Sequence, residues 1–131
     1  MNTLLNQIKQ DEGFSPIVYK CSEGFDTFGF GTKLPIDKDE AELILNHRLK
    51  KTIAQVNAFH TYLNIPGTAW DILYNMAYQM GVHGLSKFKN MFEALKVNDY
   101  ETAALEMLDS RWAKQTQNRA NRLAERMRNE R

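Results

Sequence analysis

Apolar residues recur at every third or fourth position over much of the chain, which is the spacing of amphipathic helices. The pattern is longest over residues 38–57. Residues 68–80 are apolar almost all round, as expected of a helix buried in the middle of a bundle. Helical spacing and helix-end signals predict four shorter helices, over residues 3–12, 88–97, 99–109 and 117–128. We therefore expect a mostly helical chain.

Glycines and capping side chains mark the ends of these helices. Gly13 and Gly81 are expected to stop the helices that precede them. After Pro35, the pair Asp37 and Glu40 has the spacing of a capping box. Further N-caps are expected at Thr3, Thr68, Asp99 and Thr116.

The helical pattern is interrupted over residues 17–34, where Ile-Val-Tyr, Phe-Asp-Thr-Phe-Gly-Phe and closely spaced glycines favour short antiparallel strands and tight turns. The order is then a helix, a small β-ribbon and a helical bundle, which is an α+β organisation. We expect a single domain over 1–131, with a first helix in 1–13, a small β-lobe in 14–36 and a helical lobe in 37–131.

Composition narrows the class of protein. With 43% hydrophobic and 25% charged residues, the chain has the balance of a soluble globular protein. No apolar run approaches the roughly 20 residues of a membrane span, and the first residues lack the pattern of a signal peptide. We expect no stable membrane association and a cytoplasmic location. The single cysteine excludes an internal disulfide.

A net charge of +1 argues against a dedicated nucleic-acid binder, but the charge is unevenly distributed. Residues 111–131 hold six arginines and one lysine against two glutamates, a net charge of +5. The rest of the chain is therefore near −4. The basic C-terminal helix could face DNA, an anionic cell-wall polymer, or carboxylates of the same domain.

Three polar residues near the β-ribbon are candidates for chemistry. Glu12 falls at the end of the first predicted helix, where the helix dipole disfavours an ionised carboxylate, as a general acid requires. Taken alone, a glutamate there is usually solvated, Cys21 would be a small buried residue, and Thr27 an ordinary strand residue. Their combination, followed by Gly29-x-Gly31, is more specific than any one of them.

The segment D-E-G-x5-Y-K-C-x-E-G-x2-T-x-G-x-G over residues 11–31 resembles the catalytic region of the phage-type lysozymes, glycoside hydrolase family 24. The segment NMAYQMG at 75–81 is similar to the family's buried central helix, and SRWAKQTQNRANR at 110–122 to its C-terminal signature. These segments follow the family's order along the chain. The resemblance implies a predominantly helical lysozyme-like α+β fold with a small N-terminal antiparallel β-ribbon lobe.

The resemblance also implies roles for residues. Glu12 falls on the glutamic acid that donates a proton to the glycosidic oxygen, and Thr27 on the threonine that helps to hold the attacking water. Cys21 falls where the family has an aspartate or, in some members, a cysteine. Arg119 matches the arginine that lies beside the catalytic glutamate. Asp11 and Arg122 match a neighbouring ion pair.

The role of Cys21 stays open at this point. An inverting glycosidase needs a base that activates water opposite the general acid, and a thiol with the usual pKa of about 8.5 is mostly neutral at pH 7. Cys21 could act as a thiolate nucleophile or base, it could only orient water with Thr27, or Glu23 or Asp26 could replace it. Asp26 is the weaker substitute, because neighbouring strand residues such as Asp26 and Thr27 point to opposite faces.

Substrate contacts follow the family less closely. Tyr78 and Gln79 match positions that line the saccharide cleft. Lys33, a candidate substrate-binding residue, stands in a pair of residues that differs from the histidine-leucine pair of the best-known relative. Met91 and Glu106 fall where that relative has polar sugar contacts. Details of sugar recognition are therefore not expected to carry over.

The resemblance implies an endolysin that hydrolyses the β-1,4 bonds between N-acetylmuramic acid and N-acetylglucosamine in peptidoglycan, for phage-driven host lysis. We expect it to act on glycan strands as a monomer, without metal, cofactor or nucleic acid. It would remain in the host cytoplasm until a holin lets it reach the periplasm and cell wall. The alternatives are a catalytically impaired peptidoglycan-binding module of the same fold and a nucleic-acid binder built on the basic helix.

Overall fold

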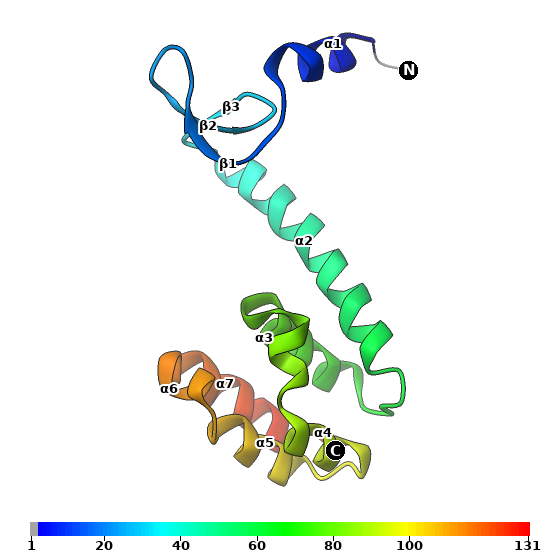
Figure 1. The fold of residues 1–131 in the computed structure, drawn as a ribbon. Coiled ribbons are helices and arrows are strands. Elements are labelled where there is room, and N and C mark those ends of the chain that lie inside the picture. Colours follow the sequence, from blue (N-terminus) through cyan, green and yellow to red (C-terminus); the bar gives the residue numbers. More distant parts are fainter. Residues whose placement is uncertain (1–2) are drawn as a thin grey trace. The chain divides into compact units, whose positions relative to one another are not determined.

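The computed structural model describes residues 3–131, and within them it has seven helices and one three-stranded antiparallel sheet (Figure 1). The predicted α+β fold class is confirmed. The chain divides into two compact units, the first ending at Ile44 and the second beginning at Leu45. The boundaries predicted within a single lysozyme-like domain stay a prediction.

The first unit holds one short helix and the sheet. Its elements are α1 (Thr3–Glu12), β1 (Ser15–Lys20), β2 (Asp26–Gly29) and β3 (Thr32–Lys33). Gly13 has a φ of 68°, and its N–H donates to the Lys9 carbonyl at 2.9 Å, so the expected glycine stop is confirmed. Helix α1 therefore ends at Glu12, where the chain turns into β1.

The sheet has the order β1-β2-β3. Thr27 in the central strand pairs with Tyr19 of β1 and with Lys33 of β3. The pairing of β1 with β2 is irregular between Ser15 and Tyr19. Thr27 has a strand on each side and is buried, with only 1% of its surface exposed.

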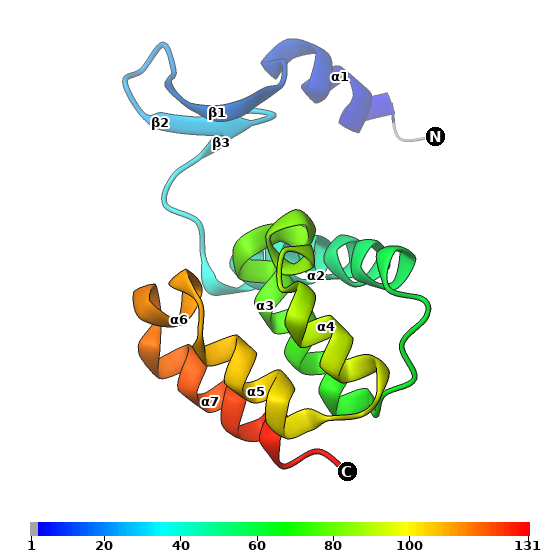
Figure 2. The ribbon, with the colours of Figure 1, turned by 60° about the horizontal axis from the view of Figure 1, so that its bottom comes forward.

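The second unit is helical. After α2 (Lys38–Phe59), which begins in the first unit, come α3 (Gly67–Ser86), α4 (Lys89–Lys96), α5 (Tyr100–Leu108), α6 (Arg111–Gln115) and α7 (Gln117–Arg128). Helices α5 and α7 pack side by side (Figure 2). Helix α6 was not predicted, because five residues are too few to show a helical period. It is nevertheless capped by Ser110, whose hydroxyl accepts from the Ala113 N–H at 3.1 Å.

Two predicted helix starts are confirmed in detail. The Asp37 N–H donates to Glu40 Oε1 at 3.0 Å, and the Glu40 N–H donates to Asp37 Oδ1 at 2.8 Å, which is a complete capping box. Asp99 caps α5 by accepting from the Thr102 N–H at 3.1 Å. The preceding Asn98 has a φ of 58°, which reverses the chain after α4.

Two predicted threonine caps, at Thr3 and Thr68, are wrong. Thr3 is already a residue of α1, and Thr68 is the second residue of α3. The Thr68 hydroxyl donates instead to Glu130 Oε2 at 2.8 Å. Thr116 does occupy the N-cap position of α7, as predicted, but its hydroxyl donates back to the Trp112 carbonyl at 2.9 Å and makes no capping hydrogen bond. The hydroxyls of Thr68 and Thr116 thus have partners other than the N-terminus of the following helix.

Helix α3 supplies much of the core of the second unit, as its nearly uniform apolar pattern predicts. Its buried residues are Ala69, Ile72, Leu73, Met76, Ala77, Val82 and Leu85. Gly81, with a φ of 83°, breaks the helix where a stop was expected, and helical structure then resumes. None of the helices described in residues 3–131 has both the length and the apolar character to span a membrane.

Candidate active site

Glu12 lies directly against the turn between β2 and β3. A Cβ added to Gly31 would be 2.8 Å from Glu12 Cγ and closer still to the carboxylate. Gly31 also has a φ of 69°, a conformation that residues with a side chain rarely adopt. The glutamate side chain therefore occupies the space that a side chain at residue 31 would fill.

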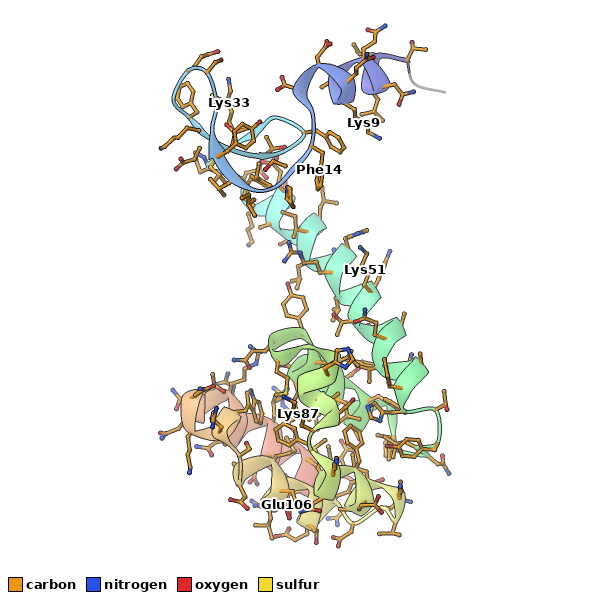
Figure 3. All side chains as sticks on the ribbon, in the orientation of Figure 1. Lys9, Phe14, Lys33, Lys51, Lys87 and Glu106 are labelled. Atoms are coloured by element: carbon orange, nitrogen blue, oxygen red, sulfur yellow. The ribbon has the colours of Figure 1, made fainter. Side chains whose placement is uncertain are left out.

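Aromatic contacts hold this end of α1 to the same turn. The rings of Phe14 and Phe30 are 5.4 Å apart, and Lys9 Nζ lies 5.6 Å from the Phe30 ring (Figure 3). Phe14 follows α1, and Phe30 lies in the β2–β3 turn beside Gly31. The position of Glu12 is thus set by contacts on both sides of the turn.

Cys21 follows β1 in a turn whose backbone favours an anion. Its N–H donates to the Phe25 carbonyl at 2.9 Å, which closes the turn. The pKa of the Cys21 thiol is lowered, first by the backbone N–H of Phe25 and then by that of Glu23. The Thr27 hydroxyl and the Lys33 charge act in the same direction, while desolvation opposes them. The site therefore stabilises a thiolate at residue 21.

Thr27 and Lys33 surround this turn from the neighbouring strands. The Thr27 hydroxyl donates to the Phe25 carbonyl at 2.9 Å. Lys33 Nζ lies 5.3 Å from the Phe25 ring (Figure 3). The structure thus brings Cys21, Thr27 and Lys33 together around Phe25, a residue that the sequence analysis did not single out.

Asp26 is engaged elsewhere. Its Oδ1 lies 2.6 Å from Lys20 Nζ in an exposed ion pair. It follows Phe25 and precedes the buried Thr27, so its side chain points away from the face that Thr27 occupies. These contacts agree with its lower rank as a substitute base.

In the second unit, the predicted site residues fall into two groups. Tyr78 and Arg119 line one groove of about 340 Å³ together with Asp71, Tyr74 and Asn75. The remaining lining residues are Leu45, Leu49 and Ile53 of α2. Tyr78 is partly exposed there, so its ring is available to a ligand.

Gln79 is turned to another partner, since its Oε1 accepts from Trp112 Nε1 at 2.8 Å. Trp112 borders a second pocket of about 530 Å³, which also contains Met91 and Glu106. Trp112 was not predicted to line a pocket, although it lies inside the quoted C-terminal segment. The cue was a large aromatic residue two positions after an N-cap serine.

Arg119 is held by α3. Its Nε and Nη2 donate to Asn75 Oδ1 at 2.9 and 2.7 Å, and Nη2 also donates to the Asn75 carbonyl at 3.2 Å. Asp11 is exposed on α1, and Arg122 is exposed on α7. The predicted neighbourhood of Arg119 and Glu12, and the predicted pair of Asp11 and Arg122, stay predictions.

The lowered thiol pKa gives a direct test. Because Cys21 is the only cysteine, the rate of alkylation by a small reagent reports on this site alone. We expect the midpoint of that rate against pH to lie below the usual value of about 8.5 in the folded protein, and to return toward it in denaturant. Equal midpoints in the two states would contradict the turn's effect on the thiol.

Comparison with known proteins places this geometry in a family. The sequence model described as "Phage lysozyme" matches residues 9–130. Two similar relatives are "Probable T4-type lysozyme 2" and "Probable T4-type lysozyme 1" of Dictyostelium discoideum, 27% and 26% identical, with 94% of this chain and 92% of each relative aligned.

The pre-baseplate central spike protein Gp5 of Enterobacteria phage T4 is 28% identical over 92% of this chain, which spans 27% of that protein's length. The matched range contains Glu12, Cys21 and Thr27, together with the Arg119 region, so the resemblance found in the sequence is confirmed. The chain belongs to the phage lysozyme family, a family of lysozyme-type glycosidases.

Proposed function

We propose that the protein is an endolysin that hydrolyses the β-1,4 bonds between N-acetylmuramic acid and N-acetylglucosamine in bacterial peptidoglycan. The observation that carries the proposal is the close contact of the Glu12 side chain with Gly31, in the same small unit as Cys21 and Thr27. Family membership and the lysozyme names of two relatives support it.

In the proposed reaction Glu12 is the general acid. It donates its proton to the glycosidic oxygen as the bond to the anomeric carbon breaks, and the leaving sugar departs as a neutral alcohol. Restriction of this side chain matters for the rate. A carboxyl that changes between rotamers spends less time within hydrogen-bonding distance of the glycosidic oxygen.

The Cys21 thiolate is the proposed base. Water attacks the anomeric carbon and gives a proton to the sulfur, while the Thr27 oxygen accepts a hydrogen bond from the same water. Solvent exchange then returns the proton from Cys21 and reprotonates Glu12. The lowered pKa of the Cys21 thiol supports this role, because only the thiolate can accept the proton.

The remaining residues have proposed supporting roles. Lys33, Tyr78 and Gln79 contact the saccharide, and Arg119 supports the general acid, as do Asp11 and Arg122. We further propose that the enzyme acts as a monomer on glycan strands during host lysis. It would wait in the host cytoplasm until a holin lets it reach the wall.

The second candidate is a peptidoglycan-binding module of the same fold. The thiol at residue 21, where the family has an aspartate or, in some members, a cysteine, is the observation that favours it. A turbidity assay on cell walls, with analysis of the released sugars, separates the two, because a binding module releases no reducing ends.

Glu12→Gln tests the general acid. Removing the transferable proton should lower the rate of wall lysis by about 10²–10⁴-fold, while the melting temperature stays near that of the parent protein. Glu42→Gln, which alters an exposed carboxyl of α2, is the matched control and should keep full activity. A folded Glu12→Gln protein with parental activity would refute the proposed mechanism.

Gly31→Ala tests whether the contact with Gly31 positions the Glu12 carboxyl. The added methyl group would collide with the Glu12 carboxylate, so we expect lytic activity to fall about tenfold or more. Gly81→Ala is the control, because Gly81 also has a positive φ, of 83°, but open space around it. Both changes strain the backbone, and only the first should displace Glu12. Equal losses of activity in the two would show that the collision is unimportant.

Replacement of Cys21 tests the base. Cys21→Asp supplies a carboxylate that is ionised at pH 7 and should remain active. Cys21→Ala removes the proton acceptor and should lower activity about 10²-fold or more. Full activity of Cys21→Ala, measured by release of reducing ends, would leave the thiol a packing group and assign the base elsewhere.

A further inference from the structure

One side chain of α3 fixes the direction of the Arg119 guanidinium. Asn75 Oδ1 accepts from both Nε and Nη2, and the Asn75 carbonyl accepts from Nη2 as well. These contacts involve Nε and Nη2, two of the three nitrogens of the planar group. Nη1, with two N–H donors, has no hydrogen-bond partner within the second unit, so those donors are left for another group.

The choice of an amide matters for charge. Within the second unit no carboxylate forms an ion pair with Arg119. Asn75 is neutral, so it accepts hydrogen bonds from the guanidinium without cancelling its charge, as an aspartate at this position would. The long arginine side chain is therefore oriented while its positive charge remains available.

Asn75 lies where this orientation has an effect. Asn75, Tyr78 and Arg119 all line the 340 Å³ groove, and Arg119 also borders the polar surface around Lys114 and Arg122. We propose that Asn75 is a positioning residue, which orients Nη1 of the Arg119 guanidinium toward an anionic or polar group of the proposed active site. This rests on the supporting role proposed for Arg119.

The simpler interpretation is a clip that only joins α3 to α7. Asn57 provides a comparison for such a purely structural link. Its Oδ1 accepts from the Tyr74 hydroxyl at 2.6 Å and so joins α2 to α3. Both asparagines link two helices through a side-chain oxygen, but only Asn75 holds a charged group. Asn57→Ala is therefore the control for loss of a helix-to-helix hydrogen bond.

The first experiment measures orientation without activity. The Nε–H signal of Arg119 is followed by NMR in the full-length protein and assigned by its absence in Arg119→Lys. We expect slow exchange with water in the parent, fast exchange in Asn75→Ala, and retained slow exchange in Asn75→Asp and Asn57→Ala. Exchange in Asn75→Ala that equals the parent's would overturn the proposal, whether or not the protein is lytic.

The second experiment is a double-mutant cycle on wall lysis with Asn75→Ala and Arg119→Ala. A misdirected guanidinium should lower kcat by about ten- to a hundredfold with little change in KM, and the double variant should be no worse than Arg119→Ala. Additive losses, or a loss in Asn75→Ala no larger than in Asn57→Ala, would overturn the proposal. Full activity of Arg119→Ala would instead refute the supporting role proposed for Arg119, on which the proposal rests.

Discussion

The contact between Glu12 and the bare Cα of Gly31 is the constraint on which the rest of the site depends. It requires a residue without a side chain, and a positive φ, at the same position of a tight turn. Only glycine meets both conditions without strain. The stop at Gly13 and the contact between the Phe14 and Phe30 rings have the same effect, because each keeps the last turn of α1 over that glycine.

A thiol in place of a carboxylate is less of a change than the sequence suggests. The backbone N–H groups of Glu23 and Phe25 belong to the turn and not to the residue they stabilise, so they favour any anion at position 21. The same backbone would accept a carboxylate or a thiolate there. This is a physical reason why one fold can carry either residue at this position.

The sequence predicted those features that depend on neighbouring residues. The capping box of Asp37 and Glu40 and the glycine stop at Gly13 need partners three or four positions away, and both are found. The helix that contains Met76 is buried because its pattern is apolar on nearly all sides. The candidate triad of Glu12, Cys21 and Thr27 came from a motif of residue types, and the contacts around it came from the structure.

Features that depend on distant partners could not be predicted in this way. Thr68 failed as a cap because its hydroxyl reaches Glu130, 62 residues away. The hydrogen bond between Asn75 and Arg119 joins residues 44 positions apart, and no local sequence pattern indicates it. Gly31 was predicted as a turn residue. Its contact with Glu12 could not be predicted, because that contact depends on where α1 ends in three dimensions.

The arginines of the C-terminal helix differ in what their partners do to their charge. Arg128 forms ion pairs with Glu101 of α5 and Glu125 of α7, so its charge is cancelled within the second unit and its role there is to join helices. Arg119 has a neutral partner in Asn75 and keeps its charge. The excess of positive charge in this part of the sequence therefore does not have a single role. Arg128 joins helices through its ion pairs, whereas Arg119 is oriented by a neutral partner that leaves its charge uncancelled.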